Sequence, residues 1–366
     1  MARVKKLLIL NSGSSSLKWS LLDAQNESTI QEGHEDQPDS GISILPSLRS
    51  LLTRFPTPDA VGHRIVHGGM LFQKTIRIDS DSREKLESLV NLDPLHMKPA
   101  LAWVDAVTTA LPQTPQFASF DTAFHSTLPE TTGYALPQAW TKKWGLKRFG
   151  FHGLSVAYAV RRAGEMLGAL PGRLIVCHLG SGSSITAVEK GKSVDTTMGF
   201  TPQEGLVMAT RSGSIDPGLL LYLQIHGGVK PEELEDALLH RSGLLGVSGT
   251  SGDLREVMKD IDNGSAPAAL AYGQFIRSAR RAVGAMAAVL GGVDTLVFTG
   301  GIGENQPRTR QDIVSTLAFA GLQLDKEKNH STNSDEDVSS KDSKARILVM
   351  KAREDLTILR EMLVCG

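Results

Sequence analysis

One pattern that occurs twice in this chain constrains its fold more than any other feature. The first copy, residues 7–22, has an apolar stretch, a polar turn of Asn, Ser and Gly at 11–16, and a second apolar stretch. The second copy, residues 174–188, repeats this order around a Gly/Ser turn at 180–184. Each copy is typical of a strand, a turn and a return strand. The copies are about 170 residues apart, which indicates two similar domains rather than a solenoid of short repeats.

A third glycine-rich turn, Gly300–Asn305, follows another predicted strand at 295–299. The segment 329–344 is polar and charged and has no period, so it is predicted to be a mobile surface loop. Apolar residues at helical spacing predict several helices between and after the turns. The remaining predicted elements are helices at 219–225, 231–239, 268–290 and 356–363 and a strand at 346–350.

Composition excludes several classes of function. The 366 residues suggest two or three domains, and 39 Lys plus Arg against 40 Asp plus Glu leave a net charge of -1. Because there is no global basic field, binding to nucleic acid or to a membrane is not expected, and any anion must be bound locally. Only 5% of the residues are aromatic, which argues against base stacking, whereas 36 glycines favour glycine-built loops.

Cysteine usage and hydropathy bear on the compartment. The two cysteines, Cys177 and Cys365, do not make a disulfide framework, and Cys177 lies in an apolar run typical of a small buried residue. The apolar part of the N-terminal segment is too short for a signal peptide, and no window has the roughly 18 apolar residues of a membrane span. We therefore expect a soluble, reduced, cytoplasmic protein.

Two common nucleotide-binding motifs do not fit this sequence. Gly191-Lys192-Ser193 matches the end of a P-loop, but position 186 is Thr where the loop needs glycine, and the context is a hairpin turn. No Gly-x-Gly-x-x-Gly follows a strand and opens a helix, so a dinucleotide-binding fold has little support. The three strand-ending glycine turns offer backbone N–H groups for phosphate oxygens, although most such turns only reverse the chain.

Ionisable residues cluster in unusual, glycine-rich settings. One Arg and two His lie at 62–69, a carboxylate lies at 120–125, a His lies between glycines at 150–153, and an Arg precedes a glycine at 210–213. Each of these groups alone is more often a satisfied structural residue. Together, two Arg, several His and one Asp predict an anion-binding, charge-neutralising site.

These segments resemble the acetate kinase family, short-chain carboxylate kinases within the wider actin, Hsp70 and sugar kinase superfamily. The resemblance covers essentially the whole chain, and its motifs occur in the family's order. They are Asn11–Lys18, His63–Gly69, Asp121–His125, Gly150–Gly153, Met198–Pro202, Thr210–Gly213, Phe298–Asn305 and Glu354–Leu356.

The resemblance implies an α/β fold of duplicated ribonuclease H-like (actin-like ATPase) domains. Each domain would be a mixed sheet flanked by helices, with an interdomain cleft. Residues 1–148 plus 353–366 would form an N-terminal acid- and phosphoryl-binding domain. Residues 149–352 would form a C-terminal nucleotide-binding and dimerisation domain, so the resemblance also implies a homodimer.

The activity implied is reversible, Mg²⁺-dependent in-line phosphoryl transfer between ATP and acetate, giving ADP and acetyl phosphate. Such chemistry needs charge neutralisation and positioning more than covalent help. Arg64 and Arg211 would clamp the carboxylate and the phosphoryl group, because a guanidinium fork suits both anions. His152 would donate to the developing charge, and Asp121 would orient an Arg or water, or poise the carboxylate.

The resemblance also implies three sets of ligand-binding residues. Asn11 and Glu354 would hold Mg²⁺, with Mn²⁺ as an alternative, directly or through water. The acid would enter a small apolar slot formed by Val66, Leu95, Phe151 and Pro202 beside Arg64. The nucleotide would be bound by Lys18, His178, Leu179, Gly180, Ser181, Gly182, Asp253, Leu254, Arg255, Gly301, Ile302, Gly303, Glu304 and Asn305. His96, His125 and His178 are alternatively structural or secondary.

The sequence departs from the family pattern at Ser181, where most members carry Asn, at Ser214, where Asp is usual, and at 351–353. Three functions therefore stay open. The first is an acetate kinase. The second is a propionate or longer-chain acid kinase, because one methylene gives only about 1–3 kcal/mol of discrimination. The third is a nucleotide-binding regulator without turnover, which the Ser181 change motivates.

Overall fold

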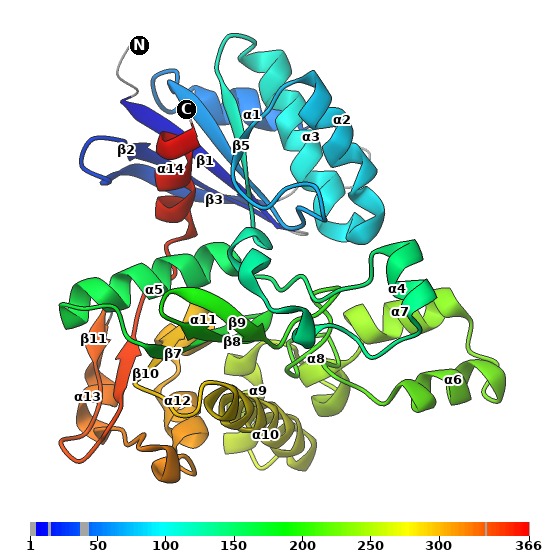
Figure 1. Ribbon diagram of the computed structural model, residues 1–366, viewed down its shortest axis with the longest axis vertical. Helices are drawn as coiled ribbons and strands as arrows, with labels where there is room; N and C mark the ends of the chain where they lie inside the picture. The colour runs from blue at the N-terminus through cyan, green and yellow to red at the C-terminus, as the bar shows by residue number, and fades with distance from the viewer. Residues whose placement is uncertain (1–4, 14–15, 37–43, 334, 366) are drawn as a thin grey trace. The chain divides into compact units, whose positions relative to one another are not determined.

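The computed structural model describes residues 5–13, 16–36, 44–333 and 335–365. The chain divides into two compact units (Figure 1). Unit 1 comprises Met1–Ser126, Phe151–Tyr158 and Arg353–Gly366, and unit 2 comprises Thr127–Gly150 and Ala159–Ala352.

Unit 1 is built on a six-stranded mixed sheet. Its strand order is β3-β2-β1-β4-β6-β5, in which β1, β4 and β6 are parallel and the other pairings are antiparallel. The hairpin predicted at 7–22 is confirmed as β1 and β2, and the tip residues 14 and 15 lie outside the described residues. The strands are β1 Lys6–Ser12, β2 Ser16–Asp23, β3 Thr29–Asp36, β4 Ala60–Ile65, β5 Ile76–Arg77 and β6 Gln116–Phe120.

Unit 2 repeats the same sheet. Its strand order is β9-β8-β7-β10-β12-β11, with β7, β10 and β12 parallel and the other pairings antiparallel, so each strand has an equivalent in unit 1. Even the register shift in β2, between Leu21 and Leu22, has a counterpart in β8, between Ala187 and Val188. The predicted duplication is therefore confirmed. The strands are β7 Arg173–Leu179, β8 Ser183–Glu189, β9 Lys192–Thr196, β10 Thr295–Thr299, β11 Glu336–Asp337 and β12 Arg346–Val349.

Helices cover the sheets. The helices of unit 1 are α1 Leu45–Leu52, α2 Ser80–Ser88, α3 Pro94–Ala110 and α14 Glu354–Cys365, and α5 Gly153–Leu167 contributes residues to both units. Those of unit 2 are α4 Gln138–Trp144, α6 Pro217–Ile225, α7 Pro231–His240, α8 Gly243–Ser248, α9 Leu254–Asp262, α10 Ala266–Val289, α11 Gly300–Asn305, α12 Pro307–Val314 and α13 Lys326–Ser331. Short 3-10 helices lie at Val90–Leu92, Ala123–Thr127, Glu130–Thr132 and Ala318–Ala320.

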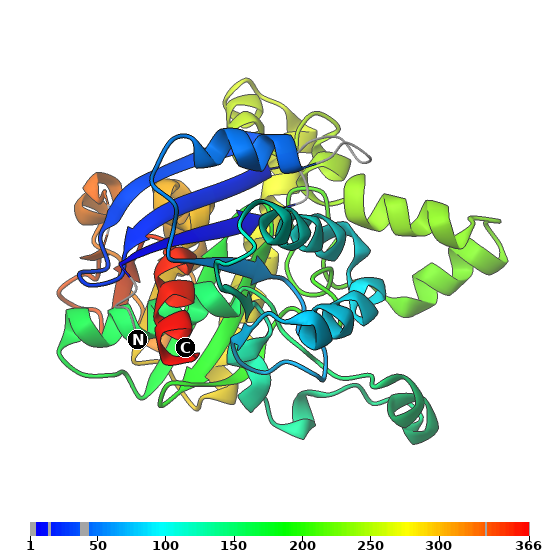
Figure 2. The same cartoon turned by 90° about the horizontal axis from the view of Figure 1, so that it is seen from above.

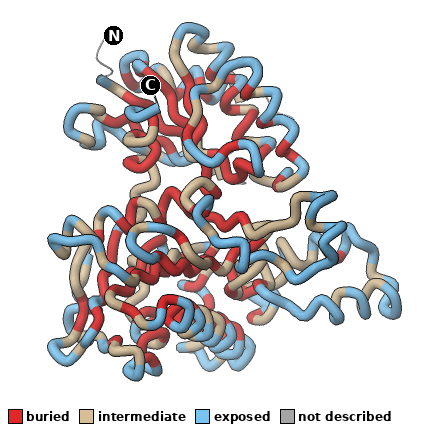
Figure 3. Tube along the Cα trace, viewed as in Figure 1, coloured by how far each residue is buried: buried red, intermediate tan, exposed pale blue. Residues whose placement is uncertain are grey.

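The apolar run of β1 follows from burial on both faces of the sheet. Leu8 and Leu10 pack with α1 and α3, where Trp103 is buried, whereas Leu7 and Ile9 pack against α14 and the start of α5. Figure 2 shows α1 and α14 on opposite sides of the strands of unit 1, and Figure 3 shows the burial concentrated along the strands. A strand covered on both faces has no solvent side, so it needs no polar alternation.

Helix starts follow the local sequence. Asp79 accepts a hydrogen bond from the Ser82 N–H at 2.8 Å and forms a capping box before α2, and Ser265 caps α10. Proline lies in the first turn of α3, α6, α7, α10 and α12, where its missing N–H has no partner to lose. The predicted helix starting at Pro231 is confirmed as α7.

Two local predictions are wrong. The third glycine turn, Gly300–Asn305, is the short helix α11. The segment predicted as a mobile loop at 329–344 contains the end of α13 and the strand β11, and it buries Asn329. Its order comes from Arg310, whose Nε donates to Asn329 Oδ1 at 2.7 Å.

The segment Thr127–Gly150 lies with unit 2, although the sequence predicts a first domain that runs to residue 148. Backbone contacts explain this, because the Phe149 N–H donates to the Gly199 carbonyl at 3.0 Å and Thr127 Oγ1 donates to the Ser193 carbonyl at 2.9 Å. Residues from Arg353 onward belong to unit 1.

Among the residues described, no helix is both long and apolar enough to cross a membrane.

Two buried histidines make stability depend on pH. Burial lowers the pKa of both His63 in β4 and His125 after β6 from 6.5 to about 4. Between these values the unfolded chain binds more protons than the folded chain, so the free energy of unfolding falls as the pH drops from 6.5 to 4. Each histidine contributes roughly 3 kcal/mol to this loss.

We expect His63→Gln to flatten the pH dependence of the urea unfolding free energy between pH 6.5 and 4, leaving the share due to His125. The matched control is His34→Gln, because His34 is exposed on β3. A slope for His63→Gln equal to that of His34→Gln would contradict the assignment.

Candidate active site

Three predicted side chains of unit 1 lie where parallel strands of its sheet end. Asn11 and Arg64 are the penultimate residues of β1 and β4, and Asp121 directly follows β6. Because these three strands are parallel neighbours, their carboxyl ends meet at one edge of the sheet. That edge is the usual ligand-binding position in α/β folds.

Arg64 connects these residues to the start of α14. Its Nε and Nη2 donate to Asp121 Oδ1 and Oδ2 at 2.9 and 2.5 Å, and its Nη1 donates to Asn11 Oδ1 at 2.9 Å. Asn11 Nδ2 donates to Glu354 Oε2 at 2.7 Å, and that oxygen lies 3.9 Å from Arg64 Nε. The structure thus brings together four of the predicted site residues in one polar network.

Burial opposes both charges of the Arg64–Asp121 pair. Burial alone would lower the pKa of the Arg64 guanidinium, but the charges of Asp121 and Glu354 raise this pKa above its ordinary value. Burial raises the pKa of the Asp121 carboxyl, and the charge of Arg64 opposes that rise. Arg64 is therefore a permanent positive charge at the strand ends.

His152 has an unusual backbone conformation beside this network. Its φ of 59° lies in the left-handed region, which residues other than glycine rarely adopt and which is frequent at functional sites. Two contacts hold this turn in place. The Gly153 N–H donates to the Asp121 carbonyl at 2.8 Å, and His125 Nε2 lies 2.9 Å from the Phe151 carbonyl. His125 therefore contacts the backbone of the turn that carries His152.

The residues predicted to form the acid slot are divided between the units. Val66 and Phe151 are buried in unit 1, and the Phe151 ring packs edge-on against His67 with 5.4 Å between ring centroids. Leu95 is half-buried on α3, and Pro202 belongs to unit 2.

One carboxylate beside this network, that of Asp93, is not among the predicted site residues. Asp93 is buried, caps α3, and its Oδ1 lies 2.9 Å from His96 Nδ1. Its charge contributes to raising the pKa of Arg64. The Asp-Pro pair that opens α3 is a helix-start signal, so it marks a cap but not a functional group.

Lys18, predicted to bind nucleotide, belongs to unit 1. It is exposed on β2 and pairs in register with Asn11 on β1. Residues directly opposite on antiparallel strands share one face of the sheet. Lys18 is therefore on the same face as Asn11.

In unit 2, a glycine turn and a glycine-rich helix occupy the equivalent strand ends. Residues 180–182 follow β7, and α11 follows its parallel neighbour β10. Gly300, at φ +79°, approaches β7 so closely that an added Cβ would lie 2.7 Å from the Leu179 carbonyl oxygen. Two of the predicted nucleotide segments are thus in contact, and only glycine allows this approach.

The predicted nucleotide segment at 253–255 connects to the segment at 180–182 through Ala209. The Ala209 N–H donates to the Ser181 carbonyl at 3.1 Å, and a Cβ on Gly252 would lie 2.9 Å from the Ala209 carbonyl oxygen. Asp253 caps α9 and forms an ion pair with Arg255, which is exposed. The Leu254 side chain is buried in the core of unit 2, so it stabilises the segment from behind.

Several contacts hold α11, which contains the predicted nucleotide segment at 301–305. Arg310 is buried, and its Nη1 donates to the carbonyls of Gly303 and Glu304 at 2.9 and 2.8 Å. Glu304 Oε1 accepts from the Ala352 N–H at 2.9 Å. Gly301 and Asn305 are exposed, Ile302 packs against the core, and His178 is half-buried on β7.

Arg211 and Pro202 meet within unit 2. Arg211 Nη1 donates to the Pro202 carbonyl at 3.0 Å and lies 3.9 Å from Met208 Sδ. Ser214, one of the departures from the family pattern, is exposed, and its hydroxyl accepts from the Gly205 N–H at 3.1 Å. Within unit 2, one hydrogen bond therefore joins Arg211 of the predicted clamp to Pro202 of the predicted acid slot.

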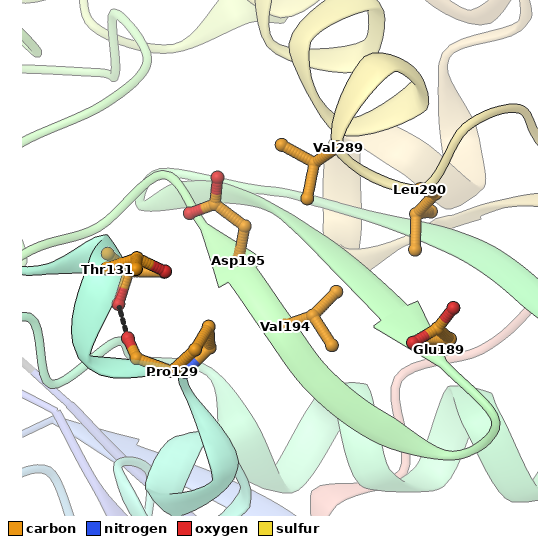
Figure 4. A pocket seen from close by; sticks show the side chains of 8 residues that line it. Pro129, Thr131, Glu189, Val194, Asp195, Val289 and Leu290 are labelled. Atoms are coloured by element: carbon orange, nitrogen blue, oxygen red, sulfur yellow. Dashed lines mark hydrogen bonds between the residues drawn. The ribbon is translucent and has the colours of Figure 1, made fainter.

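A small cavity of about 270 Å³ lies elsewhere in unit 2 (Figure 4). It combines the apolar side chains of Val194, Val289 and Leu290 with the carboxylates of Glu189 and Asp195. None of the residues lining this cavity is a predicted site residue.

Known proteins resemble this chain in sequence. A sequence profile described as the Acetokinase family matches residues 51–360. The chain belongs to the acetokinase family. An acetate kinase from Nostoc punctiforme is 39% identical over 96% of this chain and 97% of its own length.

Solved structures agree with this assignment. The acetate kinase of Porphyromonas gingivalis has a TM-score of 0.90 and 35% identity and covers 99% of both chains. A propionate kinase from Francisella tularensis has a TM-score of 0.91 and 36% identity and covers 98% of both chains. The predicted fold of duplicated actin-like ATPase domains is confirmed by these acetokinase-family structures.

The Arg64–Asp121 pair predicts a stability effect. We expect Asp121→Ala to lower the free energy of unfolding by about 3 kcal/mol, because it removes the bidentate partner of a largely buried charge. The matched control is Asp105→Ala, which removes an equally bidentate but exposed partner of Arg83 and should cost less than about 1 kcal/mol. Urea unfolding of both variants gives the comparison, and equal losses would contradict the importance of burial.

Proposed function

We propose that this chain transfers a phosphoryl group reversibly between ATP and acetate, giving ADP and acetyl phosphate. The observation that carries the proposal is the Arg64 guanidinium held at the strand ends of unit 1 by Asp121 and Asn11. Membership of the acetokinase family supports the same reaction, because relatives over nearly the full chain are named acetate kinase.

Arg64 is suited to bind the acid. A guanidinium has five N–H donors, and three of those of Arg64 bond to Asp121 and Asn11. Those that remain can bind the substrate carboxylate, while Asp121 fixes the plane of the guanidinium. The buried Val66 and Phe151 would contact the methyl group of acetate.

Arg211 and His152 would act on the transferred group. Phosphoryl transfer is accelerated chiefly by positioning and by donors aimed at the developing charge. Arg211 would neutralise phosphoryl oxygens from the position that the Pro202 carbonyl gives it. His152, fixed by its left-handed turn, would donate a hydrogen bond to the same group. The glycine turn at 180–182 and α11 would hold the nucleotide with backbone N–H groups.

Asn11 and Glu354 would hold Mg²⁺. Their amide and carboxylate oxygens fit this ion, which prefers oxygen ligands and keeps several waters. Among the described residues there is no group of three or more His, Cys, Asp and Glu side chains placed to hold a metal ion. Water and nucleotide oxygens would therefore complete the coordination. When bound, Mg²⁺ neutralises phosphate charge during transfer.

Propionate is the second candidate substrate. The observation that favours it is the similar structure that is titled a propionate kinase, at 36% identity. An apolar slot discriminates weakly against one methylene, at about 1–3 kcal/mol. The values of kcat/KM for acetate, propionate and butyrate decide between the substrates.

We expect purified protein with ATP and Mg²⁺ to form an acyl phosphate from acetate, trapped as its hydroxamate, and excess EDTA to abolish the signal. Arg64→Ala should lower kcat/KM for the acid by at least about a hundredfold, because a charge-assisted bidentate contact is lost. Arg83→Ala is the control, because Arg83 pairs with the exposed Asp105 and is not a predicted site residue. ATP binding without turnover on any short acid would instead support a nucleotide-binding regulator.

We also propose that the chain forms a homodimer through α6. None of the nine residues of this helix is buried, and Leu221, Tyr222 and Ile225 are 56%, 61% and 70% exposed. An apolar helix face of this kind is typical of an interaction surface.

Sedimentation analysis tests this surface. Wild-type protein should run at about twice 39.4 kDa, and Ile225→Glu should shift it towards the monomer because a charge would be buried in the interface. Phe319→Glu is the control, because Phe319 is an exposed apolar residue of unit 2 outside α6. A wild-type monomer, or a dimer unaffected by Ile225→Glu, would contradict the proposal.

A further inference from the structure

A cluster of three side chains in unit 2 has no role in the function proposed above. The side chains of Tyr134, Arg148 and Glu204 meet around the backbone of residues 198–202. We propose that Tyr134, Arg148 and Glu204 are positioning residues that hold the segment 198–202 and, through Pro202, the Arg211 guanidinium. The role in catalysis rests on the proposed function, in which Pro202 and Arg211 act on the substrates.

The Tyr134 hydroxyl joins the cluster to the segment. It donates to Glu204 Oε2 at 2.7 Å and accepts from the Phe200 N–H at 2.7 Å. Burial raises the pKa of the Tyr134 hydroxyl, with the Glu204 carboxylate acting in the same direction, so the hydroxyl keeps the proton that it donates. The hydroxyl therefore links the Glu204 carboxylate to the peptide N–H of Phe200.

Arg148 holds the residues that precede this peptide group. Its Nη1 donates to the carbonyls of Thr196 and Met198, each at 3.2 Å, and its Nη2 donates to Glu204 Oε1 at 2.8 Å. The guanidinium also lies over the Tyr134 ring, with 5.5 Å from its carbon to the ring centroid. Lysine could not reproduce this arrangement, because it lacks the planar fork that reaches several acceptors at once.

Gly199 shows how tightly the segment is enclosed. A Cβ at this position would lie 1.8 Å from Glu204 Oε2 and 2.0 Å from the Tyr134 hydroxyl, so any side chain would break their hydrogen bond. On its other side, the Gly199 carbonyl accepts from the Phe149 N–H at 3.0 Å. The segment is thus held between the cluster and the backbone next to Arg148.

The cluster acts on the predicted catalytic group, Arg211, through the Pro202 carbonyl. Pro202 is two residues beyond Phe200, and its carbonyl accepts from Arg211 Nη1 at 3.0 Å. Displacement of the segment by about 1 Å would move this acceptor, and misplacement of a catalytic group on that scale is costly to phosphoryl transfer. Disturbing the cluster would therefore weaken binding of the acid and positioning of the transferred group, and would leave nucleotide binding unchanged.

The test uses Tyr134→Phe in the full-length protein, because this change removes the hydroxyl and keeps the ring under Arg148. We expect the KM for the acid to rise about tenfold, the effect of losing one to two hydrogen bonds, with the KM for ATP within about twofold of wild type. Glu204→Gln should also raise the KM for the acid, because one amide oxygen can accept from Tyr134 or from Arg148 but not from both.

Tyr272→Phe is the matched control, because its hydroxyl also donates to a carboxylate of unit 2, that of Asp312 at 2.6 Å. Hydrogen–deuterium exchange of the peptide 196–202 gives a readout independent of activity. Exchange there should increase in Tyr134→Phe and stay at the wild-type level in Tyr272→Phe.

The outcomes separate the two proposals. A wild-type protein that makes no acyl phosphate overturns the proposed function, and peptide exchange then decides whether the cluster holds the segment. An active wild type with an unchanged acid KM in Tyr134→Phe, or a rise matched by Tyr272→Phe, overturns the positioning role. Unchanged hydrogen–deuterium exchange at 196–202 in Tyr134→Phe would overturn the claim that the cluster holds this segment.

Discussion

The bidentate ion pair between Arg64 and Asp121 is the interaction on which the site of unit 1 depends. It joins the ends of β4 and β6, and through Asn11 it reaches β1 and the first residue of α14. A positive charge in this position must be matched, because an unpaired buried charge is strongly destabilising. The pairing with Asp121, with Glu354 3.9 Å away, lets the sheet present a permanent cation at its ligand-binding edge.

The duplicated sheets use the same edge in different ways. In unit 1 the parallel strands end in charged and amide side chains, which suit a carboxylate and a metal ion. In unit 2 the corresponding strands end in glycine-containing segments, and an added Cβ on Gly300 would lie 2.7 Å from the Leu179 carbonyl oxygen. Glycine removes the side chain so that backbone N–H groups can approach phosphate oxygens. One architecture thus provides two chemically different sheet edges.

Site candidates could be recognised in the sequence where a local motif marked them. Arg64 lies between histidines and before glycines, and Asp121 follows an apolar run, so both stood out without the fold. Tyr134, Arg148 and Glu204 did not, because they are 14 and 56 residues apart in order along the chain and share no motif. The polar segment at 329–344 misled for a related reason, since the buried Asn329 finds its partners in Arg310 and the Pro307 carbonyl, which no local pattern shows.

The sequence by itself determined the duplication, the two hairpins that carry it, and the identity of the groups that carry charge. These follow from hydropathy period and turn chemistry, which act over a few neighbouring residues. Only the tertiary structure decided which of those groups are partners. The pairing of Arg64 with Asp121 across 57 positions, and of Arg211 with the Pro202 carbonyl, depends on which strands and loops are adjacent in the folded units. That adjacency is set by packing over the whole sheet, and no local pattern contains it.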